Sequence, residues 1–453
     1  MKRESWKSSL GFVFAALGSA VGIANICIFP YLVAKFGGAI FIMMYLFCLA
    51  LIGFPAFISE ILIGRTTSCG PAQAFKRLTG SRRWSACGKI TVFTGFLVTS
   101  FYSVLAGWVL GYFIEALRGN LGAISSPEMA QELYHRLVST PLWTISFHAI
   151  FMFICAWVVY GGVRSGIERC GKIMMPLLLI ILFSLVVRGL FLPGAGAGLR
   201  YLFFPDWSEF TVAAMLVALG QSFFTLSLGQ GTMVTFGSYL NKEDDIVKIS
   251  IPVGLGDTLI SLGAAVVIFT TVFSVGMEST EKGLGLIFQT LPIVFNQLPG
   301  GLFLAIGFFL FVTLAALTSQ VSAMEPVIAY FVDNHRFTRK KAVLFCSLAS
   351  FSLGIPSALS YSLLKNVLIG DVNFIDAVQI LSQTFLIPLG GLFAVVLVGW
   401  VWGCDKAISA LSIHKTRSFS EKKWFRCYLY YCIKYIAPIL IILVFCNQVI
   451  NLW

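Results

Sequence analysis

Charged side chains are scarce in this chain. Only 11% of its 453 residues are Asp, Glu, Lys or Arg, whereas a soluble domain carries roughly 25%. Acidic residues number 20 and histidines 4, and the histidines, at positions 135, 148, 335 and 414, lie far apart in the sequence. This composition argues against a large soluble domain. The scattered histidines argue against a metal centre or catalytic site built on histidine.

Paired cysteines and a phosphate-binding glycine motif are also missing. The 11 cysteines lie mostly inside apolar runs without a Cys-x-x-Cys pair, so we expect them to serve as small buried apolar residues. The segment GAGAG at 194–198 follows no strand pattern and precedes no Lys-Ser or Lys-Thr pair, which favours an ordinary loop. No predicted helix carries a His, Asp and Glu cluster, and Ser227 has no base beside it. We therefore expect no catalytic residues and no enzyme.

Long apolar segments are what the chain has in excess. Its mean hydropathy is +0.88, and 58% of its residues are hydrophobic. A helix needs about 20 apolar residues to cross a bilayer. Eleven runs approach that length: 10–34, 39–63, 87–117, 142–161, 170–192, 211–239, 250–276, 300–331, 342–360, 374–403 and 429–451. Because the loops are short, we predict an all-α integral membrane protein with eleven transmembrane helices and a single domain over residues 1–453.

The basic residues predict the orientation in the membrane. With a cytoplasmic N-terminus, about 25 of the 32 Lys and Arg residues fall on the cytoplasmic side, as the positive-inside rule requires. The segments KRLTGSRRW (76–84) and RFTRKK (336–341) dominate this bias. We therefore attribute the net charge of +12 to topology and contact with membrane lipid, and we expect no nucleic-acid partner. The first apolar run is interpreted as a mature helix rather than a signal peptide.

Two of the apolar runs contain residues that interrupt a helix. GSAVGIANICIFPY (18–31) combines glycines, an Asn and a Pro, and GQSFFTLSLGQGTMVTFGSY (220–239) combines Gly, Ser and Thr. The second run lies five runs after the first. Paired interruptions in corresponding places are typical of transporters built from inverted repeats. We therefore predict one five-helix repeat over 1–192, a second over 208–403, and a peripheral eleventh helix over 427–453.

An interrupted helix exposes backbone groups inside the membrane. Each unsatisfied group costs several kcal/mol in hydrocarbon, so something polar is expected to fill the gap. The N-terminal end of a half-helix favours an anion, and free carbonyl oxygens suit a hard cation such as Na⁺. The alternative is that these glycines only allow close packing of helices. Two interruptions at equivalent positions favour a binding site.

These motifs resemble those of the neurotransmitter:sodium symporter family, which has the leucine-transporter fold. GSAVGIANICIFPY looks like the family pattern G-x-A-V-G-x-G-N-x-x-R-F-P, and FFTLSLG (223–229) is similar to its core motif. Further matches are GIERCGKIMMP (166–176), LTSQ (317–320) and WGCDKA (402–407). The similarity covers nearly the whole chain. It implies a sodium-coupled symporter that works by alternating access, of the bacterial eleven-helix type, in an inner cell membrane.

The resemblance implies two sodium sites. The first would use Ala20, Asn25, Thr225 and Asp257, together with the carboxylate of the substrate. The second would use Gly18, Val21, Ala315, Thr318 and Ser319. The two hydroxyls of the second set could instead bond back to their own helix. A ligand shared by substrate and ion makes each bind more tightly in the presence of the other.

The resemblance also implies a zwitterionic substrate. Monoamine carriers of the family have an Asp at the position of Gly22, whereas Gly22 leaves room for a substrate carboxylate. A neutral amino acid with an aromatic or branched side chain is therefore expected. The implied substrate-binding residues are Ser19, Ala20, Gly22, Ile23, Ala24, Val98, Tyr102, Phe224, Thr225, Ser227, Gln230, Ser319 and Ala323.

The expected gates match the family on one side only. Arg3 and Asp333 could form the cytoplasmic bridge, with Trp6 and Tyr239 packed over it, although Arg3 could equally belong to the basic N-terminal cluster. On the outer side Asp376 matches the gate acid. The Arg that usually pairs with this acid is missing, because Ile28 stands at its position.

Other family features concern chloride and protein class. Tyr45, Gln221, Thr225 and Ser261 match the chloride site of chloride-dependent members, but the nearby acid Asp257 predicts that chloride is not required. Glu60 is expected to satisfy freed backbone near the interrupted helices. A substrate sensor or a proton-coupled amino-acid carrier on the same scaffold stays open, as does a homodimer.

Overall fold

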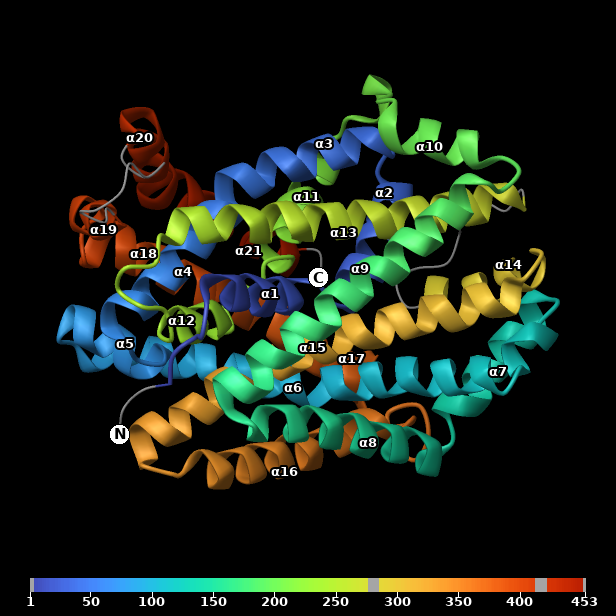
Figure 1. The fold of residues 1–453 in the computed structure, drawn as a ribbon, viewed down its shortest axis with the longest axis horizontal. Coiled ribbons are helices and arrows are strands. Elements are labelled where there is room, and N and C mark those ends of the chain that lie inside the picture. Colours follow the sequence, from blue (N-terminus) through green and yellow to red (C-terminus); the bar gives the residue numbers. More distant parts are fainter. Residues whose placement is uncertain (1–3, 276–284, 412–421, 451–453) are drawn as a thin grey trace.

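The computed structural model describes residues 4–275, 285–411 and 422–450. Helices make up nearly all of this structure (Figure 1). The first nine are α1 (Ser9–Ala20), α2 (Phe29–Lys35), α3 (Ala39–Cys48), α4 (Phe54–Thr67), α5 (Pro71–Thr79), α6 (Arg82–Leu117), α7 (Pro127–Val138), α8 (Pro141–Tyr160) and α9 (Arg169–Leu190).

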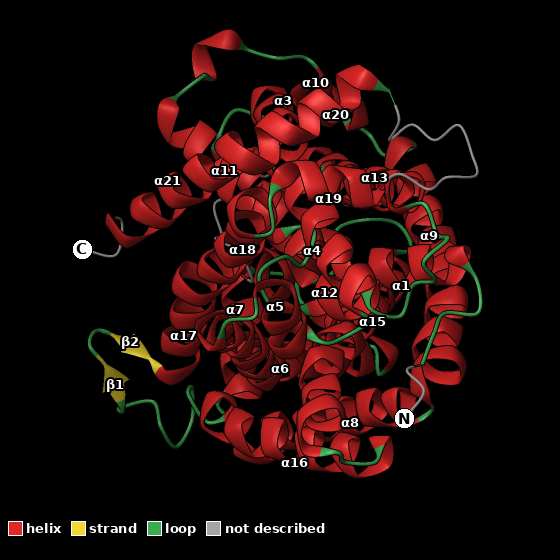
Figure 2. Ribbon diagram, turned by 90° about the vertical axis from the view of Figure 1, so that its left-hand side faces the viewer, coloured by secondary structure: helices red, strands yellow, loops and turns green. Residues whose placement is uncertain are grey.

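The second part of the chain is also almost entirely helical. Its helices are α10 (Ala195–Phe203), α11 (Val212–Phe224), α12 (Thr232–Gly237), α13 (Ile246–Ser274), α14 (Leu291–Asn296), α15 (Gly301–His335), α16 (Arg339–Ala358), α17 (Phe374–Gln379), α18 (Ile387–Val396), α19 (Cys404–Leu411), α20 (Lys423–Tyr431) and α21 (Ala437–Ile450). Strands β1 (Leu368–Ile369) and β2 (Val372–Asn373) form a small antiparallel hairpin that the sequence had not predicted (Figure 2).

Several long helices contain wide, π-type turns. Such turns occupy Ala24–Ile28, Leu49–Gly53, Val163–Glu168, Leu286–Thr290, Ile380–Leu386, Leu397–Val401 and Cys432–Ile436, and shorter 3₁₀ turns occupy Asn120–Ala123 and Trp207–Glu209. A π-type turn adds a residue to the helix and often marks a functional site. The turn at Ala24–Ile28 follows the first interruption predicted from the sequence.

The described residues contain nine helices that are long and apolar enough to cross a membrane, or ten if the bent pair Ser9–Ala20 and Ala24–Lys35 counts as one span. Helices dominate because an apolar helix bonds its own backbone groups within the segment. The segment Val212–Phe224 is a shorter apolar helix. The membrane class predicted from the apolar runs is therefore confirmed.

The centre of the bundle is formed by the two longest helices, α6 and α15, which pack against each other (Figure 1). Helix α1 lies against α15, α13 and α9, while α12 packs on α4 and α11 packs on α3. Helices α8 and α16 pair at one edge of the bundle, beyond α6 (Figure 2). This arrangement brings the two interrupted segments, α1–α2 and α11–α12, into the protected middle of the structure.

Candidate functional site

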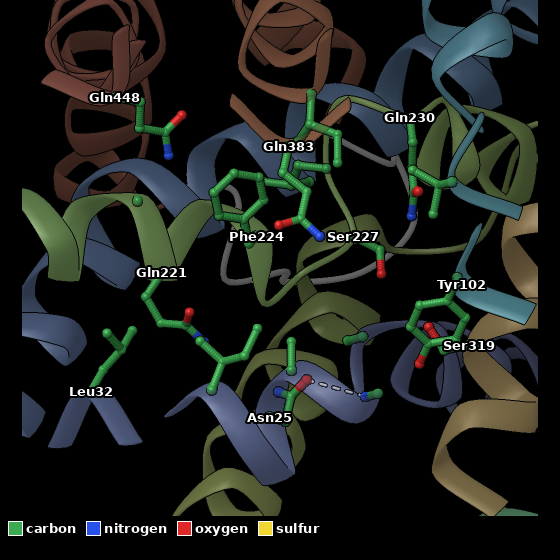
Figure 3. A pocket seen from close by; sticks show the side chains of 18 of the residues that line it. Asn25, Leu32, Tyr102, Gln221, Phe224, Ser227, Gln230, Ser319, Gln383 and Gln448 are labelled. Carbon is green, nitrogen blue, oxygen red and sulfur yellow. Dashed lines mark hydrogen bonds between the residues drawn. The ribbon is translucent and has the colours of Figure 1, made fainter. Parts of the chain in front are cut away.

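The first interrupted segment bends sharply where α1 ends. The helices on its two sides meet at an angle of 56°. The backbone N–H of Gly22 donates to the side chain of Asn25 at 3.1 Å (Figure 3), and the N–H of Ile23 donates to the hydroxyl of Tyr102 at 3.1 Å. A Cβ atom on Gly22 would lie only 2.8 Å from that hydroxyl. A side chain at Gly22 would therefore displace the Tyr102 hydroxyl.

The second interrupted segment is non-helical between Phe224 and Thr232. Ser227, at φ +54°, and Gly229, at φ +78°, adopt left-handed backbone conformations, which end the regular helix. The N–H of Gly229 donates to the carboxylate of Glu60 at 2.7 Å. Glu60 thus satisfies a backbone group freed by the interruption, as the sequence predicted.

Hydrogen bonds join the two interruptions directly. The hydroxyl of Ser227 donates to the carbonyl oxygen of Ser19 at 2.7 Å. The same carbonyl accepts a second bond, of 3.2 Å, from the hydroxyl of Ser319 on α15. These bonds hold both interrupted helices to one another and to the central helix α15. Small polar side chains thus satisfy a backbone carbonyl that the interruption leaves without a helical partner.

A cavity of about 360 Å³ lies between the two interruptions. Most of the substrate-binding residues predicted from the sequence line it: Ala20, Gly22, Ala24, Val98, Tyr102, Phe224, Ser227, Gln230, Ser319 and Ala323. Ser19, Ile23 and Thr225 stand behind this wall and join it through the hydrogen bonds described here. From the breaks the cavity extends along α2 to Leu32 (Figure 3).

Three predicted sodium ligands form one buried cluster beside the cavity. The Asn25 amide donates to the Thr225 hydroxyl at 2.9 Å and to the Asp257 carboxylate at 2.8 Å. Thr225 donates to the other oxygen of Asp257 at 2.6 Å. The amide also reaches the hydroxyl of Ser261, at 3.0 Å, and Tyr45 approaches Asp257 at 3.4 Å. Several oxygen atoms thus converge in a space from which solvent is excluded.

The residues predicted for the second sodium site lie where α1 meets α15. A Cβ atom on Gly18 would lie 2.9 Å from the Cβ of Thr318, so the two helices are nearly in backbone contact. The Thr318 hydroxyl donates back to the carbonyl oxygens of Leu314 and Ala315, at 3.2 and 3.0 Å. This is the back-bonded arrangement that the sequence left open as an alternative. In this arrangement two of the predicted ligands, the Thr318 hydroxyl and the Ala315 carbonyl oxygen, lie within hydrogen-bonding distance of each other.

An aromatic and ionic network closes the N-terminal side of the site. The ring of Trp6 packs edge-on against Tyr239, with ring centres 6.1 Å apart, and the Tyr239 hydroxyl donates to Glu325 at 2.6 Å. Both Glu325 oxygens accept bonds from Arg339, at 2.8 and 2.7 Å. Arg339 also lies 3.7 Å from the carboxylate of Glu4. The Glu325–Arg339 pair was missed at the sequence level, although a Glu within an apolar run is a functional signal.

The described residues predicted to form the gate ion pairs lie at two places in the structure. Arg3 lies outside the described residues, and its expected partner Asp333 accepts a hydrogen bond from the N–H of Gly70 at 2.9 Å. Asp376 lies in α17 near Tyr361 and Tyr134. Burial and then the charges of Tyr361 and Asp376 raise the pKa of Tyr134.

The cavity is also lined by residues that the sequence analysis did not predict as binding residues. Ile28, the residue at the position of the expected gate Arg, lines the cavity together with Gln383. Asn447 and Gln448 of α21 also line it (Figure 3). The helix over 427–453, expected to be peripheral, therefore reaches the cavity with its C-terminal turn. Carboxamides inside apolar runs were the available signal for these residues.

A bundle of apolar helices with two interruptions around a central cavity defines a membrane transporter. Comparison with known families matches residues 3–131 and 139–453 to the sodium:neurotransmitter symporter family. The chain belongs to this family, which confirms the resemblance found in the motifs. The family consists of transporters, in keeping with the expectation that the chain is not an enzyme.

Individual relatives agree with this assignment. The chain is 35% identical over 448 residues to the uncharacterized sodium-dependent transporter YhdH of Bacillus subtilis, covering 99% of this chain and 98% of that protein. An uncharacterized sodium-dependent transporter of Haemophilus influenzae is 34% identical, with the same coverage of both chains. Among solved structures, the crystal structure of MhsT in complex with L-phenylalanine matches with a TM-score of 0.87 and 36% identity, over 98% of this chain and 100% of that chain.

Proposed function

We propose that the protein is a sodium-coupled symporter of a neutral amino acid with an aromatic or branched side chain. The observation that carries this proposal is the contact between Gly22, Ile23 and Tyr102 at the cavity. Gly22 brings no acidic side chain to this end of the cavity, and an added side chain would meet the Tyr102 hydroxyl. This supports a substrate that brings its own carboxylate. The phenylalanine bound by MhsT supports the same class of substrate.

The two ends of the amino acid meet different backbone groups. The carboxylate accepts from the amides around Gly22, Ile23 and Ala24 and from the Tyr102 hydroxyl, at the positive N-terminal end of a helical segment. The ammonium group lies near the carbonyl oxygens of Ala20, Phe224 and Thr225. The side chain occupies the pocket formed by Val98, Gln230 and Ala323, with Ser19 behind its wall, Ser227 and Ser319 alongside, and Phe224 covering it.

Two sodium ions are proposed to bind beside the substrate. The first takes the converging oxygens of Asn25, Thr225 and Asp257 with the carbonyl of Ala20, and the substrate carboxylate completes its shell. For this, the Asn25 side chain would turn its carbonyl oxygen toward the ion. The second is bound between α1 and α15 by Gly18, Val21, Ala315, Thr318 and Ser319. The Thr318 hydroxyl would then turn its lone pairs toward the ion.

Transport is proposed to follow alternating access. The described helices support eleven spans if α1–α2 and α11–α12 each form one broken span, arranged as two inverted repeats with α20–α21 as the last span. The cavity reaches Leu32, whereas the Trp6 and Tyr239 side is closed, so the conformation corresponds to an outward-facing carrier. The N-terminus is proposed to lie in the cytoplasm of a bacterial cell, with the protein in the inner membrane.

The outer gate is proposed to close without an ion pair. With Ile28 in place of an Arg, closure relies on apolar contact, and Asp376 contributes through water or polar neighbours. Asp376→Asn should then reduce sodium-driven uptake only partly, measured with radiolabelled substrate in proteoliposomes. A complete loss of uptake in a folded variant would contradict this gate.

Chloride is proposed to be dispensable. The carboxylate of Asp257 lies within hydrogen-bonding distance of Asn25 and Thr225 and supplies the negative charge that balances the sodium ions. Uptake should continue when gluconate replaces chloride in the external buffer, and uptake that stops in gluconate would refute this.

One further candidate function rests on the altered outer gate. Ile28 leaves the extracellular side without the usual ion pair, and a protein that binds substrate without moving it would act as a sensor. A proton-coupled amino-acid carrier on the same scaffold is the other alternative. The sensor would bind substrate without net flux, and the proton-coupled carrier would work without sodium.

The decisive experiment measures thermal unfolding of the purified protein with each of the twenty amino acids, in NaCl and in choline chloride. A ligand that binds the folded state raises its apparent stability. We expect stabilisation by a few large neutral amino acids only in NaCl, and sodium-driven uptake of the same amino acids in proteoliposomes. Stabilisation only by Gly or Ala would refute the substrate class, equal stabilisation in choline would favour a proton-coupled carrier, and binding without uptake would favour a sensor.

A further inference from the structure

A second large concavity lies far from the amino-acid cavity, on the outer face of the α8–α16 pair. This α8–α16 groove has a volume of about 990 Å³ and is lined by residues of these two helices and the turn before α16. Its walls are apolar, with Phe153 67% and Trp157 74% exposed. The two helices pack together along the edge of the bundle (Figures 1 and 2), so the groove opens toward the hydrocarbon of the membrane.

One end of the groove is strongly basic. Lys340 and Lys341 line it, and neither forms an ion pair with an acidic side chain among the described residues. The ammonium group of Lys340 lies 5.3 Å above the ring of Tyr160, and that of Lys341 lies 4.7 Å above Phe337. The contact with Tyr160, which also lines the groove, holds the Lys340 cation at its mouth. The first turn of α16, which begins at Arg339, adds N–H groups that favour an anion.

The opposite end of the groove fixes its length. The lining residues run along α16 from Lys340 to Phe351, a rise of about 16 Å along the helix. This is about half of the roughly 30 Å hydrocarbon core. The groove thus matches the depth of one leaflet. Its basic end lies on the same side as the N-terminal segment, because Arg339 lies 3.7 Å from Glu4.

A buried hydroxyl marks the boundary between the basic and apolar parts. Ser347 lines the groove and is 7% exposed, and its Oγ has no hydrogen-bond partner among the described residues. It lies six residues beyond Lys341, or about 9 Å deeper along the helix. Unpaired polar groups in hydrocarbon are costly, so a turn of the Ser347 side chain toward the groove would let a polar group of an occupant accept from the hydroxyl.

We propose that the α8–α16 groove binds an anionic phospholipid of the cytoplasmic leaflet. The headgroup phosphate lies at the end of the groove lined by Lys340 and Lys341, and an acyl chain lies along Phe153 and Trp157. A second copy of the chain fits this face less well. A twofold contact through α16 would bring the lysine pairs of both copies together without acids to neutralise them.

The experiment uses Trp157 as a reporter of what fills the groove. The full chain is reconstituted into phosphatidylcholine vesicles containing phosphatidylglycerol, and either lipid is supplied with brominated acyl chains, which quench tryptophan on contact. The signal of Trp157 is the difference between the wild type and Trp157→Phe. A lysine near an anionic headgroup contributes about a fivefold preference, so the pair should give a preference for brominated phosphatidylglycerol on the order of 25-fold.

Two variants separate a specific site from general attraction to negative lipid. Lys340→Gln with Lys341→Gln should remove the preference while leaving quenching by brominated phosphatidylcholine unchanged. The control is Lys242→Gln with Lys248→Gln, which removes the same charge outside the groove and should leave the preference intact.

Three results would overturn the proposal. The first is equal quenching by both lipids in the wild type. The second is an equal loss of preference in both double variants, which would indicate only a general surface charge effect. The third is a Trp157 that neither lipid quenches in a protein that sediments as a dimer, which would assign the groove to a second copy.

Discussion

A methyl group added at Gly22 is the smallest change that tests how the carboxylate end of the site is built. In Gly22→Ala the new Cβ would lie 2.8 Å from the Tyr102 hydroxyl and 3.2 Å from the Ser319 Oγ. Ordinary contact begins at 3.4 Å, so the hydroxyl must retreat by roughly 0.6 Å. Its 3.1 Å hydrogen bond from Ile23 would then become too long to count as one.

The size of the effect follows from the bonds involved. Displacing the Tyr102 hydroxyl would also remove its proposed hydrogen bond to the substrate carboxylate. A hydrogen bond to a charged group contributes about 1.5–3 kcal/mol, and about 1.4 kcal/mol is a tenfold change in affinity. We therefore expect Gly22→Ala to weaken binding of the amino acid about 10- to 100-fold in NaCl, measured as the concentration that gives half of the maximal thermal stabilisation. Stability without ligand should change little, because the hydroxyl can move into the cavity.

The matched control is Gly254→Ala. Gly254 lies within α13, and its added Cβ would meet only Phe54 at an ordinary 3.9 Å, so binding should be unchanged. Tyr102→Phe should reproduce the loss, and the double variant with Gly22→Ala should be no weaker than the worse single variant, since both remove the same bond. Unchanged affinity in Gly22→Ala, in a folded protein, would refute this account of the site.

Three further variants test other parts of the structure. Asp257→Asn should raise the sodium concentration needed for half-maximal stabilisation at least about tenfold, because a buried anionic ligand is lost; an unchanged sodium titration would remove this residue from the site. Glu325→Gln removes the buried, doubly bonded partner of the Arg339 guanidinium and leaves only the half-exposed Glu4 at 3.7 Å. It should lower the free energy of unfolding by up to about 3–5 kcal/mol, seen as a lower melting temperature. Replacing both Glu325 and Arg339 with Met should recover much of the loss, and no recovery would contradict the pairing. Gly229→Ala should prevent accumulation of folded protein, because its Cβ would lie 2.0 Å from a backbone oxygen and its φ is +78°. The control Gly80→Ala, at φ +69° with open space around it, should lower the free energy of unfolding by only about 1–2 kcal/mol. Equal yields of both variants on size-exclusion chromatography would contradict the steric argument.

The membrane-spanning helices were predictable because a bilayer imposes both their length and their composition. The interruption at Gly22 was predictable for the same reason, since Gly, Asn and Pro rarely coincide in an apolar run without a use. The π-type turns were not predictable, because one added residue in a helix leaves no trace in an apolar pattern. The β1–β2 hairpin was also missed. Its strands are two residues long, shorter than any strand pattern that sequence periodicity can detect.

The candidate site was predictable where family motifs carry it and less so elsewhere. Asn25 and Thr225 stand in such motifs, and the structure brings them together at 2.9 Å. Gln383 and Gln448 were missed because a single amide in an apolar run does not say which way its side chain faces. Arg339 was seen only as part of a basic loop. Its partner Glu325 lies fourteen residues earlier on α15, and only the turn between α15 and α16 brings the two charges together.

The two ends of the cavity are built from different chemistry, and we expect them to respond differently to temperature. The N-terminal end is held by the Glu325–Arg339 ion pair and its hydrogen bonds, whereas the proposed outer end presents the apolar side chain of Ile28. Apolar contacts weaken on cooling, while a hydrogen-bonded ion pair does not depend on that effect. Cold should therefore loosen the outer closure first, and a chilled membrane should hold a larger share of carriers with their cavity open to the outside.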